Sequence, residues 1–248
     1  HMGSHAYFQK TRGTQVVMSL GEAGQIFSPL GLQLQYNNFP MALFPDYPEL
    51  GTAPCVPDRV ILPGEEAVTL FGATFGILRT PGHTVDHICT RTPDNVLYLG
   101  DAMMTGRTLH HSKFPYAFCV KDYLDSMRKM RTEPAEKFIV AHFGIYDEIL
   151  PLVDMEARFF AERMVDLLDL IEGPTTPAKM AADIDAGDLR NLSYFASSSL
   201  SYINYLRGLG YLEAYIEDNQ IFYRRTPASY ERKEQKREAV LPKTGQFR

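Results

Sequence analysis

Two segments of the chain place metal-binding side chains where predicted strands end. Within residues 79–101, His83 lies on a Pro-Gly turn and Asp101 directly follows a short apolar strand. His142 follows a second apolar run, residues 137–141. A rigid sheet holds side chains at its strand ends in place while leaving them open to the surroundings, so many folds carry their sites there. The pattern therefore predicts a sheet with three ligand-type side chains at its rim.

The same residues resemble the later motifs of the metallo-β-lactamase superfamily. That family has Thr-Pro-Gly-His-Thr-x-x-His, then Gly-Asp after a strand, then a histidine after another strand, and this chain carries all three in that order. The resemblance implies that His83 binds a first metal ion, that Asp101 bridges two ions and that His142 binds the second. It also implies that His87 hydrogen-bonds a neighbouring group instead of binding metal. Catalysis would then depend on His83 and Asp101.

The family signature His-x-His-x-Asp-His is absent from this sequence. The chain starts His1-Met-Gly-Ser, and this start has two interpretations: residues left by an expression vector, or the last histidine of the signature followed by its usual small residues. We favour the second, on which His1 binds the second metal ion and further residues are expected upstream. On either interpretation the first metal site lacks two of the family's ligands, so this chain by itself is expected to be a weak or inactive catalyst.

Length and composition exclude several classes of protein. A chain of 248 residues with 45% hydrophobic content can bury one large domain and a small second one. The net charge of −5 provides no general attraction to nucleic acid. No apolar run is long enough to span a membrane. The three scattered cysteines favour a reducing cytoplasm over a disulfide framework.

Short strands are predicted to recur in the first part of the chain, between Pro-Gly, Phe-Gly and Pro-Asp-Asn turns. The expected strands are residues 14–19, 59–62, 67–71, 74–78, 87–90, 96–99 and 137–141, with helices at 6–11 and 121–131. Residues 28–57 contain six prolines and little periodicity, which fits either a substrate-covering loop or a surface insertion. With the resemblance, this pattern predicts an α/β protein whose residues 1–150 form an αββα metallo-β-lactamase sandwich.

A different pattern begins after residue 150. Three helices, expected at 153–171, 177–184 and 193–209, precede two strands at 211–216 and 220–224. This order is similar to the winged-helix modules appended to some members of the superfamily. We therefore predict a winged-helix-like α+β domain over residues 151–226 and a charged tail over 227–248. The third helix has few basic residues and many Ser and Tyr, which favours packing or a homodimer over nucleic-acid binding.

Other polar residues near the predicted site are weaker candidates. His110 and His111 follow Asp101 in the sequence, and they would lie near substrate if their loop borders the metal ions. The alternative is that both are exposed histidines without a role. Lys113 and Tyr116 belong to the same stretch and are considered for the same reason.

Three functions remain open at this point. The favoured one is a metal-dependent hydrolase that acts on a small-molecule ester, thioester, lactone or phosphodiester. It would use two zinc ions, or iron or manganese with the same nitrogen and oxygen ligands, to make hydroxide available near neutral pH. The second is an endonuclease or RNA-processing enzyme, suggested by the winged-helix-like segment. The third is a non-catalytic protein or a di-iron relative, because one fold hosts many chemistries.

Overall fold

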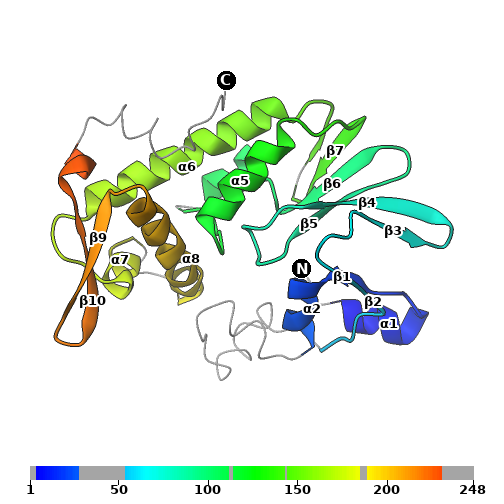
Figure 1. Ribbon diagram of the computed structural model, residues 1–248, viewed down its shortest axis with the longest axis horizontal. Helices are drawn as coiled ribbons and strands as arrows, with labels where there is room; N and C mark the ends of the chain where they lie inside the picture. Colours follow the sequence, from blue (N-terminus) through cyan, green and yellow to red (C-terminus); the bar gives the residue numbers. More distant parts are fainter. Residues whose placement is uncertain (1–3, 28–53, 112–113, 143, 185–188, 231–248) are drawn as a thin grey trace.

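The computed structural model describes residues 4–27, 54–111, 114–142, 144–184 and 189–230. Within these residues a small sheet and a larger sheet lie between two sets of helices (Figure 1). The α/β fold predicted from the sequence is confirmed. The predicted strands recur within a residue or two of their expected positions from residue 59 onward, because each is bounded by a turn that the sequence marks clearly.

The smaller sheet consists of two parallel strands with two helices beside it. Its elements are α1 (His5–Arg12), β1 (Val17–Ser19), α2 (Leu20–Ile26) and β2 (Arg59–Ile61). Val16 and Ile26 pack with Cys55 in a small apolar cluster beneath these helices. The sequence pattern predicted α1 and β1, but it did not predict α2.

The larger sheet has six strands whose spatial order is their sequence order. They are β3 (Ala67–Leu70), β4 (Ala73–Arg79), β5 (Ile88–Arg91), β6 (Val96–Gly100), β7 (Lys137–Val140) and β8 (Gly144–Tyr146). Strands β6 and β7 are parallel, and every other neighbouring pair is antiparallel. Strands β4, β6 and β7 therefore run in one direction, so their carboxyl ends meet at the same edge of the sheet.

Three helices cover one face of the larger sheet: α4 (Gly106–His111), α5 (Val120–Met130) and α6 (Leu150–Leu170). Leu97, Leu99 and Phe138 of the sheet belong to one hydrophobic core with the buried faces of α5 and α6. Helix α5 forms where the sequence pattern predicted it, and its apolar side chains Tyr123, Leu124, Met127 and Met130 are buried. The sequence pattern predicted a loop where α4 forms. That helix begins after Thr105, whose carbonyl accepts the N–H of the buried Leu109 at 3.0 Å.

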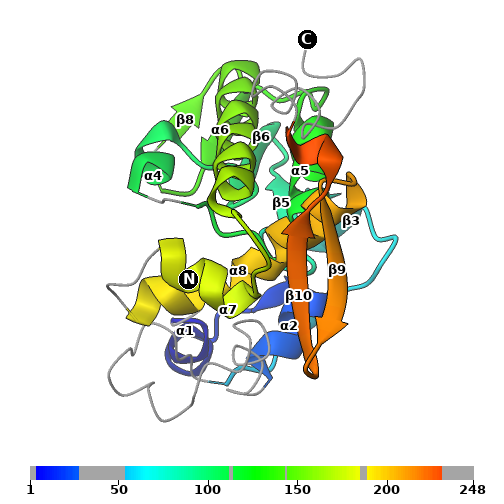
Figure 2. The ribbon, with the colours of Figure 1, turned by 90° about the vertical axis from the view of Figure 1, so that its left-hand side faces the viewer.

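The remaining elements are α7 (Pro177–Ile184), α8 (Leu189–Gly208), β9 (Leu212–Glu217), β10 (Gln220–Arg225) and the 3₁₀ turn η3 (Pro227–Tyr230). Figures 1 and 2 show α7, α8 and the β9–β10 hairpin gathered at one end of the molecule. Their buried residues join the same core as α5 and α6. The boundary at residue 150 and the winged-helix assignment therefore stay predictions.

The end of the described chain differs from the predicted tail. Residues 227–230 form η3, with Ser229 fully buried and bonded to the Arg225 guanidinium, whereas residues 231–248 lie outside the described residues. No helix within the described ranges is long and apolar enough to cross a bilayer. The three cysteines, Cys55, Cys89 and Cys119, are all free thiols, as expected for a chain without a disulfide framework.

Candidate metal centre

The three predicted ligands meet at the edge of the larger sheet where β4, β6 and β7 end. His83 lies in the turn after β4, Asp101 follows β6, and His142 follows β7. The Asp101 carboxylate presents one oxygen to each imidazole. Its Oδ2 is 3.8 Å from His83 Nε2, and its Oδ1 is 3.3 Å from His142 Nε2. This is the relation expected of a carboxylate placed between two metal positions.

Two glycines of the motif are required by close packing around these ligands. Gly82 has a φ of +131°, and a Cβ there would lie 2.2 Å from the backbone nitrogen of Tyr123 at the start of α5. Gly100 has a φ of +54°, and a Cβ there would lie 2.8 Å from His87 Nε2. Both backbone conformations favour glycine. The turn that carries His83 can therefore press against α5 only because residue 82 has no side chain.

His87 hydrogen-bonds the backbone of Asp101, which is the kind of role that the family resemblance implied. Its Nε2 accepts the Asp101 backbone N–H at 3.3 Å, so its Nδ1 carries the proton and donates to the Thr80 hydroxyl at 2.8 Å. Burial lowers the pKa of His87 to about 4, with the nearby His83 as a second cause. A neutral His87 thus links the His83 turn to the residue that follows β6.

Asp86, also within the motif, ties the His83 turn to the smaller sheet. Its Oδ2 accepts the backbone N–H of Gly21 at 2.9 Å, and its Oδ1 accepts from the Arg79 guanidinium at 2.6 Å. The Ser19 hydroxyl donates to the Asp86 backbone carbonyl at 2.6 Å. The sequence analysis did not assign Asp86 a role, although its place inside the motif was a signal for one.

A fully buried acid, Glu156 of α6, lies beneath the loop that follows Asp101. Its Oε2 accepts the Met104 backbone N–H at 3.0 Å, and its Oε1 is 2.7 Å from the Tyr123 hydroxyl. That hydroxyl is also 3.4 Å from the Asp101 backbone carbonyl. Burial raises the pKa of Glu156 to about 8, so the acid is mostly protonated at neutral pH. The sequence analysis missed Glu156 because a single acid in an amphipathic helix reads as a solvent-facing residue.

His83 itself is largely buried, with 19% of its side chain exposed. Burial lowers its pKa, the Asp101 charge opposes that shift, and the imidazole is consequently held in its unprotonated form. Its Nδ1 is buried and has no hydrogen-bond partner among the described residues. The Tyr116 ring meets the His83 ring edge to face, with centroids 5.3 Å apart. Tyr116, a weak candidate by sequence, therefore lies against the site.

These observations fit part of a two-metal site. An unprotonated imidazole whose Nε2 faces a carboxylate, with that carboxylate shared by a second imidazole, is a donor set that zinc, iron or manganese accepts. Among the described residues, however, no three His, Cys, Asp or Glu side chains are arranged to hold one ion together. Each ion would take two protein ligands from this trio, His83 with Asp101 and His142 with Asp101.

The other predicted site residues are not placed with these three. His1 and Lys113 lie outside the described residues. His110 and His111 belong to the last turn of α4, and only their backbone is described. Their predicted closeness to substrate remains a prediction.

Comparison with known proteins agrees with this geometry. Residues 1–142, more than half of the chain, match the sequence profile of the metallo-beta-lactamase superfamily. No curated protein matches the chain.

Two crystal structures share the fold. A metallo-beta-lactamase family protein from Thermus thermophilus has a TM-score of 0.66 and 20% identity, over 91% of this chain and 76% of that one. A beta-lactamase domain protein from Burkholderia ambifaria has a TM-score of 0.64 and 18% identity, over 91% of this chain and 70% of that one. At these identities the likeness shows the fold alone. With the profile match, it establishes that this chain belongs to the metallo-beta-lactamase superfamily.

Proposed function

We propose that the protein is a hydrolase that uses two divalent metal ions, zinc foremost, on a small-molecule ester, thioester, lactone or phosphodiester. Membership of the superfamily implies metal-dependent hydrolase activity. The observation that supports the two-ion form is the Asp101 carboxylate, which faces His83 with one oxygen and His142 with the other. When bound, the ions would supply Lewis acidity and lower the pKa of water, so that hydroxide is available near neutral pH.

The chain's own residues would position and protect this chemistry. Burial keeps His83 unprotonated, which leaves a nitrogen lone pair available for a metal. His87 and the Gly82 turn hold the backbone around His83 and Asp101. His142 lies on the solvent-exposed side of the site, because 40% of its side chain is exposed, compared with 18% for Asp101. Substrate would therefore approach from the side of His142.

The nuclease alternative has less support. In the described part of the C-terminal segment, basic side chains are engaged within the chain: Arg224 pairs with Glu213 at 2.6 Å, and Arg225 donates to the Ser229 hydroxyl at 2.9 Å. A phosphate-binding surface needs several accessible cations. A small-molecule substrate is accordingly the partner that we propose, and the three free cysteines support a cytoplasmic location.

The test is the substitution Asp101→Ala. The zinc content of purified wild-type and variant chains is measured by mass spectrometry, and turnover is followed on an ester, a thioester, a lactone and a bis-aryl phosphodiester. Loss of the shared carboxylate should remove at least one ion and lower turnover by more than the roughly 10–100-fold loss typical of a residue that only hydrogen-bonds a ligand.

The matched control is Asp94→Ala, an exposed aspartate in the turn before β6, at the opposite edge of the sheet. This variant should keep both metal content and turnover. If Asp101→Ala retains as much zinc as the wild type, Asp101 is not a metal ligand and the proposal is wrong.

A further inference from the structure

Helix α8 carries three hydroxyl side chains on one face, at the spacing i, i+3 and i+4. The Ser198 hydroxyl accepts the backbone N–H of Ala117 at 3.3 Å, and the Ser201 hydroxyl accepts that of Val120 at 2.6 Å. The Tyr202 hydroxyl donates to the backbone carbonyl of Pro115 at 2.7 Å. All three hydrogen bonds therefore reach a single short stretch of backbone, residues 115–120.

The opposite side of this stretch bonds the turn that carries His83. The Cys119 N–H donates to the Gly82 carbonyl at 3.0 Å, and the Phe118 N–H donates to the His83 carbonyl at 3.4 Å. The Tyr116 ring meets the His83 ring. Residues 115–120 thus form a single layer of backbone between α8 and His83. Residues 115, 117 and 120 bond α8, and residues 118 and 119 bond the His83 turn.

The backbone groups that hydrogen-bond the α8 hydroxyls lie in the protein interior. Ala117 and Val120 are fully buried, as is the ring of Tyr202. A buried N–H without an acceptor is strongly unfavourable, so the serine hydroxyls at these positions satisfy a requirement of the fold. Two of the serines of α8, Ser198 and Ser201, therefore have a role in packing the helix against residues 115–120.

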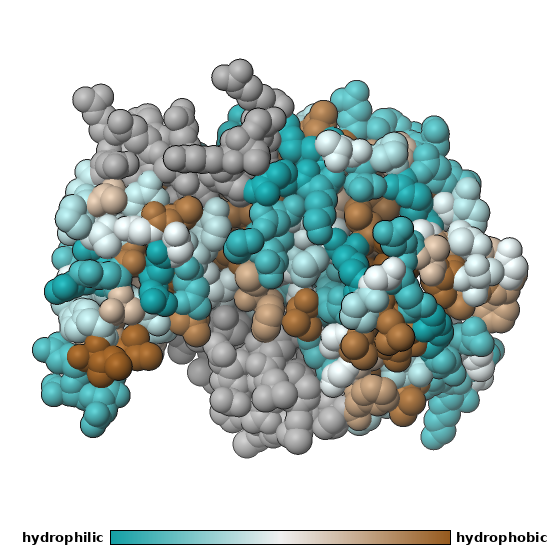
Figure 3. All heavy atoms as spheres, viewed as in Figure 1, coloured by the Kyte–Doolittle hydropathy of each residue, from teal (hydrophilic) through white to brown (hydrophobic). Residues whose placement is uncertain are grey.

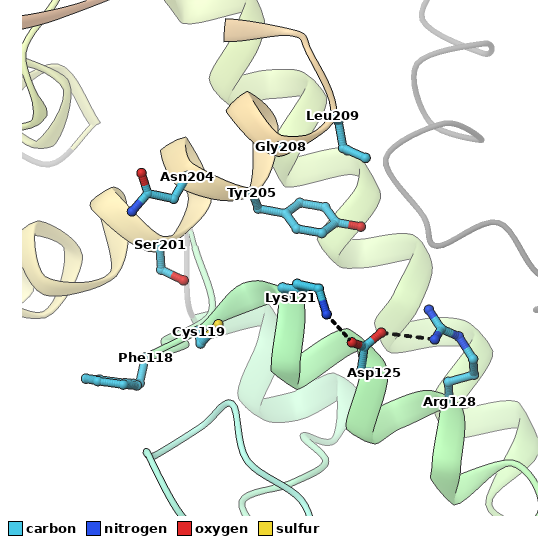
Figure 4. A pocket seen from close by; sticks show the side chains of 10 residues that line it. All are labelled: Phe118, Cys119, Lys121, Asp125, Arg128, Ser201, Asn204, Tyr205, Gly208 and Leu209. Atoms are coloured by element: carbon cyan, nitrogen blue, oxygen red, sulfur yellow. Dashed lines mark hydrogen bonds and ion pairs between the residues drawn. The ribbon is translucent and has the colours of Figure 1, made fainter. Parts of the chain in front are cut away.

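The contact with this stretch ends near Ser201. Beyond that residue a groove of about 560 Å³ lies between the outer sides of α8 and α5, with Phe118, Cys119 and Ser201 at one end and Tyr205 and Leu209 at the other (Figure 4). The hydroxyl face from Ser198 to Tyr202 is the part of α8 that hydrogen-bonds residues 115–120.

We propose that Ser198, Ser201 and Tyr202 are positioning residues that hold His83 in place for metal binding, through residues 115–120. The role rests on the proposed metal site, and it assigns the C-terminal helix a part in that site instead of in nucleic-acid recognition. Removing the hydroxyls should loosen the His83 turn and weaken binding of the metal ion that His83 holds. Asp101 and His142 should keep their positions, because they follow β6 and β7.

The test compares Ser201→Ala, Tyr202→Phe and their double variant with Ser201→Thr, which keeps the hydroxyl. Zinc alone is titrated by calorimetry, and the visible spectrum of the cobalt(II)-loaded protein reports ligand geometry. The double variant should bind one zinc ion, the one that His83 holds, roughly tenfold less tightly, as for other residues that orient a ligand. Its cobalt spectrum should change, whereas Ser201→Thr should match the wild type in both readouts.

Amide hydrogen exchange provides a readout that needs no metal. The amides of Phe118 and Cys119 should exchange faster in Ser201→Ala than in the wild type, because the backbone bonds to Gly82 and His83 open more often. The control is Asn204→Ala on the same helix, whose amide oxygen accepts from Arg207 at 3.4 Å, and it should change nothing. The single variants keep the test decisive if the double variant does not fold.

The outcomes separate the two proposals. A wild-type chain that binds zinc, together with variants that match it in zinc affinity, cobalt spectrum and exchange, would refute the role of α8 and leave the metal site standing. A wild-type chain that binds no zinc would refute both.

Discussion

The turn at residues 80–87 and the β9–β10 hairpin both join antiparallel strands, but they are built in opposite ways. In the first, Thr80 is buried and Gly82 packs so closely against α5 that a methyl group has no room. In the second, Ile216 and Ile221 face each other across the strands and remain 75% and 53% exposed. Hydrophobic side chains show on the surface at the lower end of this hairpin (Figure 3).

The two turns differ in which residues determine their backbone conformation: the hairpin's own residues in one case, and distant elements in the other. The hairpin turn has Asp218 and Asn219 at φ values of 47° and 59°, the left-handed pair that a two-residue turn requires. Stacking of Tyr215 on Phe222, with centroids 5.8 Å apart, adds a cross-strand pair. The 80–87 turn instead depends on α5, α2 and β6, which reach it from distant parts of the chain. Substitutions should therefore have large effects in the turn and small ones in the hairpin region.

The largest expected effect is that of Gly82→Ala. The added Cβ would lie 2.2 Å from the Tyr123 nitrogen, at a φ of +131° that disfavours any side chain. Backbone strain and overpacking together should lower the free energy of unfolding by more than about 3 kcal/mol, measured by urea denaturation. The matched control is Gly210→Ala, beside the hairpin, where φ is +81° and nothing lies within 4 Å. Its loss should be about 1–2 kcal/mol. Equal losses at the two positions would contradict the comparison.

The second effect concerns the acid beneath the site and depends on pH. The pKa of Glu156 is raised from its ordinary 4.5 to about 8. Its stabilising contribution is therefore complete below pH 4.5 and is lost as the pH rises through about 8. Relative to Glu156→Gln, which cannot ionise, the wild type should lose up to about 1.4 kcal/mol of unfolding free energy per pH unit across this window.

The measurement is urea unfolding of both chains at several pH values between about 5 and 8, inside the window set by the two pKa values. Tyr123→Phe is the companion variant, because it retains the acid but removes the hydroxyl beside it. Its stability should still fall with pH relative to Glu156→Gln. Parallel pH curves for the wild type and Glu156→Gln would show that the acid is ionised in the folded protein.

The smallest expected effect is in nucleic-acid binding by the C-terminal segment. Fluorescence titration with duplex DNA at about 150 mM salt should give affinity weaker than about 10 μM, with little dependence on salt. Arg224→Gln should not change it, because Arg224 is already paired with Glu213. Submicromolar affinity that falls steeply with salt would overturn this expectation and favour the nuclease alternative.

Sequence alone was sufficient for elements with a clear local pattern, although it did not predict the short helices α2 and α4. Turn residues and alternating apolar residues placed β3 to β7, the apolar stripe placed α5, and Asp218-Asn219 placed the hairpin turn. The motif residues His83, Asp101 and His142 were singled out because each follows a strand with a recognisable pattern. These features are local, so a linear reading contains the information that specifies them.

Only the tertiary structure determined how the predicted strands, helices and ligand residues are brought together. Parallel pairing of β6 with β7 brings Asp101 and His142 to one edge. Strand β5 is antiparallel to both β4 and β6, so β4 runs in the same direction as β6 and the His83 turn that follows it lies at that edge too. Glu156, Asp86 and the hydroxyls of α8 were not assigned roles, because each acts on backbone between 52 and 87 residues away. A hydrogen bond between distant segments leaves no periodic trace in the sequence, since only the folded chain brings its donor and acceptor together.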